Sequence, residues 1–171
     1  MKLMLRRRLH ERLWTYRVRV MSQSTGTVWP IKIGERLKRR HLHALVGGAQ
    51  QWGITSCLKG AAMLVFSNPK RSRQYGYERW EGPRSDGSYH YTGQGTVGHQ
   101  DVTTRANRQL LRSKALGKPI HLFESEGTEV TYIGQHELAE DPYRWEEAPD
   151  EKGENRRVVV FHLVRVEIDH A

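Results

Sequence analysis

Residues 88–100, SYHYTGQGTVGHQ, decide how the rest of this sequence is interpreted. Gly93, Gly95 and Gly98 have the G-x-G-x-x-G spacing of dinucleotide-binding loops. In such a fold the preceding strand is buried and consists almost entirely of Val, Ile and Leu. Here that strand is Ser-Tyr-His-Tyr-Thr, and polar residues separate the last glycine from the next predicted helix. The glycine spacing is therefore weak evidence for a nucleotide cofactor, and no cofactor is predicted.

The same stretch has the residue types of a pocket for a nucleobase. The Tyr91 ring offers a face on which a base can stack, and the Thr92 hydroxyl can hydrogen-bond a base edge. Glycine lets the backbone approach a ligand closely. Such a pocket suits a base that has been taken out of the DNA stack. The alternative is a sheet whose tyrosines pack across neighbouring strands, and the residue types alone leave both interpretations open.

The segments around this stretch predict more short strands than helices. A basic helix is expected over 36–45, and a second helix over 102–117 with Asp101 or Thr103 as its cap. Strands are expected over 61–67, 119–125, 128–138 and 156–168, with a loop over 73–92 and an acidic loop over 139–155. No regular β-α-β alternation is present. The pattern indicates an α+β fold with a curved antiparallel sheet or open β-barrel and two or three flanking helices.

Charge and composition point to a nucleic-acid partner. The 171 residues carry a formal net charge of +9, and the basic surplus lies before residue 119, whereas the remainder is acidic. This asymmetry suits one face directed at phosphates, although solvated surface charges would give a similar count. The single cysteine excludes an internal disulfide and fits a reducing cytoplasm. No apolar run is long enough to cross a membrane, so we expect a cytoplasmic protein with no membrane partner.

Several motifs together resemble the SRA (SET- and RING-associated) domain of eukaryotic readers of methylated cytosine. They are Tyr91-Thr92-Gly93-Gln94-Gly95, Gln100, Val102-Thr103, Asn107 and Gly117-Lys118-Pro119. Residues 30–167 are still more similar to the SRA-like domains of bacterial Mcr-type, modification-dependent HNH endonucleases. That similarity is carried by Arg39-Arg40, Leu42-His43, Gly47-Gly48, Gly53-Ile54 and the Arg156–Phe161 stretch. We therefore expect residues 27–171 to form an SRA-like domain, and residues 1–26 to be a basic extension outside its core.

The resemblance implies a PUA-like crescent that flips a modified cytosine into a pocket between two tyrosine rings. By position, Tyr91 is one ring, Thr92 and Gly93 are pocket contacts, and Tyr77 is the second ring, with Tyr75 in reserve. A carboxylate that accepts from the cytosine amine is also implied. Its candidates are Glu78, Glu81 and Asp86.

Residues that contact the DNA outside the base are harder to choose, because solvated helix faces have the same composition. The candidates are Lys38, Arg39, Arg40, Gln50, Gln51, Gln94, Thr96, His99, Gln100 and Arg105. Asn107 is better explained as a loop anchor than as a DNA contact.

The predicted function is that of a reader rather than an enzyme. The histidines are dispersed and do not have the spacing of an HNH metal site, so no metal or catalytic residue is assigned. We expect binding of double-stranded DNA with 5-methyl- or 5-hydroxymethylcytosine by base flipping, in a restriction or defence context. Any cleavage would come from a nuclease on another chain or domain. The alternative is a PUA-like RNA-binding or orphan domain that reads no modified base.

Overall fold

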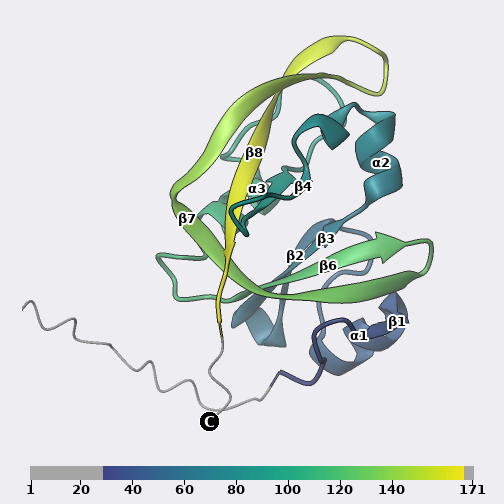
Figure 1. The fold of residues 1–171 in the computed structure, drawn as a ribbon, viewed down its shortest axis with the longest axis vertical. Coiled ribbons are helices and arrows are strands. Elements are labelled where there is room, and N and C mark those ends of the chain that lie inside the picture. The colour runs from purple at the N-terminus through teal and green to yellow at the C-terminus, as the bar shows by residue number, and fades with distance from the viewer. Residues whose placement is uncertain (1–28, 168–171) are drawn as a thin grey trace, which may run out of the picture.

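The computed structural model describes residues 29–167 (Figure 1). The expected extension over 1–26 lies outside the described residues. In chain order the elements are β1 (Arg36–Lys38), α1 (Arg39–Val46), β2 (Ile54–Cys57), η1 (Leu58–Gly60), β3 (Ala62–Ser67), α2 (Pro69–Gln74), η2 (Tyr77–Arg79), β4 (Gly82–Pro83), β5 (Tyr89–Thr92), α3 (Arg105–Leu111), β6 (Ile120–Glu126), β7 (Glu129–Pro149) and β8 (Asn155–Arg165). Within residues 29–167 no helix is long and apolar enough to span a membrane.

One eight-stranded sheet organises the described chain, in the order β2-β3-β6-β7-β8-β5-β4, with β1 paired to β7. The predicted α+β fold with an open, curved sheet is confirmed. One pair departs from the antiparallel prediction, because β3 and β6 run parallel with Met63 opposite Ile120. The chain between them, residues 68–119, crosses over and carries α2, η2, β5 and α3. Both parallel strands therefore end on the same side, at Ser67 and Glu126.

Strand β7 is much longer than predicted. The acidic segment 139–155 is expected to be a loop, but β7 continues through it to Pro149, and only the turn over 150–154 remains. The pairing with β8 shifts register between Leu138 and Tyr143, where the strand bends. β7 pairs with β6 along its first part and with β8 along its second (Figure 1). Over residues 139–149 its acidic residues form two adjacent pairs, Glu140-Asp141 and Glu146-Glu147, and only Ala148 is buried, so the rest of this part of the strand is half-buried or exposed and tolerates the charge.

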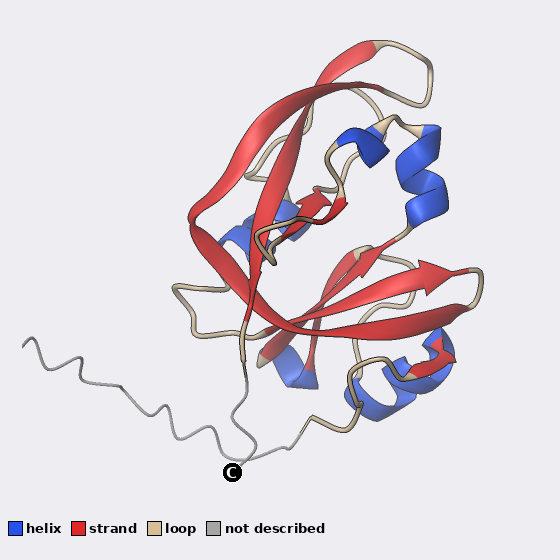
Figure 2. Cartoon of the chain, in the orientation of Figure 1, coloured by secondary structure: helices blue, strands red, loops and turns tan. Residues whose placement is uncertain are grey.

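The helices are shorter than their sequence patterns suggest. Of the predicted helix over 36–45, the first part is β1, and α1 buries Leu42, His43 and Val46. The second helix, α3, covers Arg105–Leu111 only, and neither predicted cap serves it, since Thr104 is the N-cap residue. Asp101 instead accepts from the Thr103 N–H (2.7 Å) in the turn before the helix. In the view of Figure 2, α2 lies above and α1 below the β6–β7 hairpin.

The predicted loop over 73–92 also contains regular structure, namely the end of α2, then η2, β4 and β5. Strand β8 shows why this segment is held in place. Val159, Phe161 and Leu163 pack into one core cluster, while Val158 and Val160 on the opposite face pack under Tyr75, Tyr77 and Trp80. Because both faces of β8 are buried, its sequence is a nearly continuous apolar run.

Candidate nucleic-acid interface

A cavity of about 450 Å³ lies where the parallel strands β3 and β6 end. It is lined by α2, η2, β5 and the segments that follow β5 and β6, and by residues 51–53. Most of the predicted pocket residues and some of the predicted DNA contacts meet here. These are Tyr75, Tyr77, Glu81, Tyr91, Thr92, Gly93, Gln94, Thr96, Arg39 and Gln51.

Tyr91 forms part of the cavity wall, but its ring belongs mainly to the core. It stands opposite Phe161 in the β5–β8 pair and is 5% exposed. Its hydroxyl lies against Gly53, where an added Cβ would come within 2.8 Å of it. Burial raises the pKa of the Tyr91 hydroxyl well above its usual range. The Tyr91 ring therefore belongs to the core and also borders the cavity, and its role as one of the rings that stack on a base stays a prediction.

The aromatic side chains of α2 and η2 form the other candidate rings. Tyr75 and Tyr77 stack with ring centroids 5.5 Å apart, and Tyr77 packs against Trp80. The Tyr77 hydroxyl accepts from the Arg156 guanidinium, and burial raises its pKa. Trp80 donates its indole N–H to the Thr92 hydroxyl (3.1 Å), which links η2 to β5. Stacking and hydrogen bonds thus fix both predicted second-ring candidates relative to the wall formed by β5.

The three candidate carboxylates occupy different environments. Glu78 and Asp86 are exposed, and Asp86 caps its own turn by accepting from Ser88. Glu81 alone of the three lines the cavity. Its Oε1 accepts from the Ser67 and Ser72 hydroxyls, both at 2.9 Å, and its Oε2 accepts from the Thr92 N–H (3.2 Å). A carboxylate offers about four acceptor positions. These three bonds fix Glu81 and leave about one of its acceptor positions without a hydrogen bond.

The glycine-rich segment 93–100 is held by buried amides. Asn107, which is fully buried, accepts from the Gln94 N–H (2.8 Å) and donates to the Gln94 and Asp101 carbonyls. Gln100 donates to the carbonyls of Gly93 (2.7 Å) and Gly95 (3.0 Å) and accepts from the Val159 N–H. The prediction that Gln100 contacts DNA is therefore wrong, because its amide is buried and its two N–H groups are used within the loop.

Two buried charged residues that the sequence does not single out tie this segment to the β7–β8 turn. Arg156 is 2% exposed and donates to the Gly95 and Gly98 carbonyls as well as to Tyr77. Asp150 accepts from the Gly98, Lys152 and Glu154 N–H groups. The available signal was a basic residue at the start of an apolar strand, Arg156 before Val158–Phe161. Such a residue needs internal partners when the strand is buried.

Arg39 lies in a different environment from Lys38 and Arg40, the basic residues beside it in the sequence. It is half-buried, lies over the Phe66 ring at 3.7 Å and donates to the Trp52 carbonyl (2.6 Å). Burial lowers the pKa of its guanidinium. Lys38 and Arg40 are exposed and do not line the cavity. Arg39 is therefore a cavity residue, whereas its neighbours remain surface cations.

The loop over 47–53 faces this cation. Gln50 and Gln51 are exposed, and Trp52 is 58% exposed at the cavity. With its amide oxygen turned toward this loop, Gln94 accepts from the N–H groups of Gly53 (2.7 Å) and Ile54 (2.9 Å). Gln94 therefore connects the glycine-rich segment to the loop, in addition to lining the cavity.

The other predicted DNA contacts lie outside the cavity. His99 is exposed and its Nδ1 accepts from the Arg157 N–H (2.9 Å), while Arg105 is exposed at the start of α3. Sequence reasoning also missed several cavity residues that come from other segments. These are Phe66, Asn68, Ser72 and Ser125. Their positions depend on the β3–β6 pairing, which no local pattern shows.

Comparison with known proteins places this geometry in a family. The family model described as "ScoMcrA-like, SRA domain" matches residues 33–170. No curated protein sequence matches the chain.

Several solved structures share the fold. One contains the sulfur-binding and SRA domains of ScoMcrA with phosphorothioated DNA (TM-score 0.61, 21% identity), and it matches 81% of this chain and 40% of that one. Another is the SUVH5 SRA domain with methylated CHH DNA (TM-score 0.56, 20% identity), where the match covers 84% of this chain and 94% of that one. A third is the modification-dependent restriction endonuclease AspBHI (TM-score 0.56, 14% identity), where the match covers 74% of this chain and 67% of that one. Against the ScoMcrA endonuclease structure, the match spans only 28% of its length.

These structural matches have low sequence identity and establish the fold, whereas the family model covers most of the sequence. The resemblance stated from the cavity-lining and strand motifs is therefore confirmed at the level of the family. The chain belongs to the family of ScoMcrA-like SRA domains.

Proposed function

We propose that this chain binds double-stranded DNA and reads a modified cytosine that has rotated out of the stack into the cavity. The observation that carries the proposal is a single hollow in which tyrosine rings and one fixed carboxylate come together. Flipping costs a few kcal/mol of unstacking, and stacking on aromatic rings, at about 1–3 kcal/mol per base, offsets it. Tyr75, Tyr77 and Tyr91 supply the ring surfaces.

Glu81 is the proposed reader of the base edge. Three donors already hold its carboxylate at the cavity lining, and we propose that its remaining acceptor capacity binds the exocyclic amine of cytosine. Thymine presents a carbonyl oxygen at the same place, which a carboxylate repels. This chemistry selects cytosine over thymine without fixing the group attached at C5.

The structural neighbours support DNA as the ligand. SUVH5 SRA structures contain methylated and fully hydroxymethylated DNA, and the ScoMcrA structure contains phosphorothioated DNA. We therefore propose a cytosine carrying a 5-methyl or 5-hydroxymethyl group as the target. Exposed cations, among them Lys38, Arg40 and Arg105, are proposed to contact phosphates without reading sequence.

Recognition, rather than cleavage, is the role proposed for this chain. Two of the structural neighbours are restriction endonucleases, and the match covers a minor part of ScoMcrA. We propose that a nuclease on another chain or domain acts on the DNA that this domain marks, in a defence context.

The test compares matched duplexes that carry cytosine, 5-methylcytosine or 5-hydroxymethylcytosine at one position, at a stated salt concentration. The wild-type chain is expected to bind at least one modified duplex more tightly. Glu81→Gln keeps the side-chain shape but changes one acceptor into a donor, and we expect about a tenfold loss on the preferred duplex only. Glu78→Gln, an exposed neighbour in the same segment, is the control and should leave affinity unchanged.

Two results would count against the proposal. Equal binding of all three duplexes by the wild-type chain would remove modified-base reading. Tighter binding of matched RNA than of any duplex DNA would instead favour the PUA-like RNA-binding alternative. If Glu81→Gln and Glu78→Gln both leave discrimination intact, another group reads the base edge.

A further inference from the structure

The cavity of about 450 Å³ described above is called the base cavity from here on. A second hollow, of about 490 Å³, adjoins it along α2. Its lining residues are Asn68, Lys70, Arg71, Gln74, Tyr75 and Gly127. Four of them, Asn68, Arg71, Tyr75 and Gly127, also line the base cavity, so the two hollows share a wall. Lys70, Arg71 and Gln74 are exposed, which makes this hollow an open groove at the surface. We call it the α2 groove.

The α2 groove is lined by donors and carries positive charge. None of its six residues is acidic, and Lys70 and Arg71 contribute two cations. In the part of the chain that the structure describes, ion pairs link carboxylates to Arg36 and Arg144 only, so Lys70 and Arg71 form no ion pair there. An open, doubly cationic groove favours an anion.

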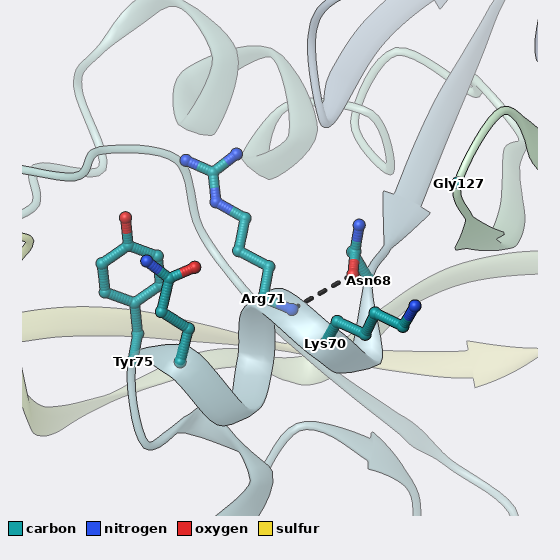
Figure 3. Close-up of a pocket in the computed structure, with 6 residues that line it drawn as sticks. Asn68, Lys70, Arg71, Tyr75 and Gly127 are labelled. Atoms are coloured by element: carbon teal, nitrogen blue, oxygen red, sulfur yellow. Dashed lines mark hydrogen bonds between the residues drawn. The ribbon is translucent and has the colours of Figure 1, made fainter.

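The donor side chains lie along one side of α2. Figure 3 shows Asn68, Arg71 and Tyr75 extending to the same side of the helix, whereas Lys70 runs past Asn68 and points away from the Arg71 guanidinium. The Asn68 Oδ1 accepts from the Arg71 N–H (3.1 Å), which leaves the amide nitrogen pointing outward. The Arg71 guanidinium lies 5.8 Å from the centre of the Tyr75 ring. Guanidinium, ammonium and amide donors thus line one groove, and donors of these kinds bind phosphate oxygens.

We propose that the α2 groove binds the backbone phosphate next to the flipped nucleotide. This inference rests on the proposed function, because it takes a base to occupy the neighbouring cavity. A base remains attached to its sugar and phosphates, so a flipped nucleotide must bring its backbone out of the cavity across one wall. The wall shared with the α2 groove carries the Arg71 cation, and Lys70 lies next to Arg71 in the groove itself.

A phosphate contact that depends on base flipping differs from a general phosphate contact in which duplexes it affects. Lys70 and Arg71 meet this phosphate only when the nucleotide is rotated out, since the groove adjoins the base cavity. Their contribution is therefore larger on the modified duplex than on the unmodified one. An ordinary backbone contact weakens all duplexes to a similar extent when it is removed.

The experiment removes the charge of one phosphate at a time. Methylphosphonate linkages are placed singly at positions around the modified cytosine, and binding is measured for the wild-type chain, Lys70→Ala/Arg71→Ala and Arg108→Ala. Arg108 is an exposed arginine on α3 that lines neither hollow, and it serves as the matched control. Retained secondary structure and melting temperature are required of each variant.

For the wild-type chain and Arg108→Ala we expect about a tenfold loss at one phosphate adjacent to the modified base. Lys70→Ala/Arg71→Ala should bind the unsubstituted duplex more weakly and should no longer respond to that substitution. On a plot of the logarithm of affinity against the logarithm of salt concentration, the slope should become shallower by about one, because the protein no longer neutralises one phosphate.

If the double variant keeps the wild-type sensitivity at the adjacent phosphate, the groove proposal is overturned while modified-base reading stands. If the wild-type chain does not distinguish modified from unmodified duplex and no single phosphate matters, both proposals fall. Uniform weakening by the double variant on every duplex, with the phosphate response intact, also overturns the groove proposal.

Discussion

Two segments that line the base cavity contact each other, through Gly53 with Tyr91 and Gln94, and they are built in different ways. The wall formed by β5 and residues 93–100, which we call the fixed wall, is held by buried amides and by Arg156, which bind the carbonyls of Gly93, Gly95 and Gly98. The wall formed by residues 47–53 is mostly exposed, and its end that lines the cavity is held by Arg39, by Gln94 and by the Phe66 N–H. For the proposed binding of a flipped base, the fixed wall would set the geometry of the site and the 47–53 wall could adjust to the base.

This comparison makes a graded set of expectations about stability. Substitutions in the fixed wall should unfold the domain more readily, and substitutions in the 47–53 wall should change DNA binding with less effect on unfolding. Four substitutions test it, in descending order of expected effect.

Tyr91→Ala should have the largest effect. The ring is buried in the main core cluster, so its removal should cost about 4 kcal/mol of unfolding free energy, measured by urea denaturation. Tyr91→Phe keeps the ring and should cost far less, which makes it the variant suitable for DNA-binding measurements. A near-wild-type unfolding midpoint for Tyr91→Ala would show that the ring is not part of the fixed wall.

Gly93→Ala should follow, at about 3 kcal/mol. An added Cβ would lie 2.5 Å from Val159 Cγ1 and 2.8 Å from Asn107 Oδ1, and neither neighbour is free to move. Gly47→Ala in the 47–53 segment meets no atom within 4 Å and carries only the cost of its backbone conformation (φ 79°, ψ −160°), about 2 kcal/mol. Equal unfolding midpoints for the two variants would contradict the distinction between the walls.

Asn107→Ala should cost about 2 kcal/mol, because it leaves the N–H and carbonyl of Gln94 without their partner. Hydrogen exchange should report faster opening of residues 93–100 in this variant. The exposed Gln50→Ala should leave both unfolding and exchange unchanged. Protection of residues 93–100 that survives the removal of the Asn107 amide would mean that Gln100, Arg156 and Asp150 hold the loop without it.

Trp52→Ala should have the smallest effect on stability, below about 0.5 kcal/mol, since the side chain is 58% exposed. Its effect should show in DNA binding, because it lies at the cavity and offers a ring to the incoming strand. A fluorescence titration with modified duplex would detect this. A variant that is destabilised yet binds normally would reverse the assignment of this wall.

Sequence patterns predicted the cavity-lining residues of β5 better than the residues that hold the cavity side chains in place. Tyr91-Thr92-Gly93 was identified from a local motif, and all three line the cavity. The choice among Glu78, Glu81 and Asp86 could not be made, because Ser67 and Ser72, which fix Glu81, come from a separate segment. Gln100 was misassigned for a similar reason. A polar residue beside a glycine loop has the same appearance in sequence whether its amide points outward or into the loop.

The fold shows the same division. The strand over 61–67 was predicted nearly to its ends, since its apolar run is bounded by Gly and Pro. The extent of β7 was missed, because its acidic residues suggested a loop until the exposed face of the strand was known. Local patterns therefore defined segments well, whereas pairing between distant segments decided which charges are exposed.

The parallel pairing of β3 with β6 also has a consequence for how the domain assembles. Every element of the fixed wall lies within residues 68–119, the chain that connects these two strands. That connection can close only when its two ends meet in register, a contact of large sequence separation that carries an entropic cost of loop closure. Proteins dominated by such contacts fold slowly. Newly synthesised chains should therefore acquire the β6–β7–β8 meander first and the recognition site last, so that DNA binding in a refolding experiment lags behind the recovery of sheet structure.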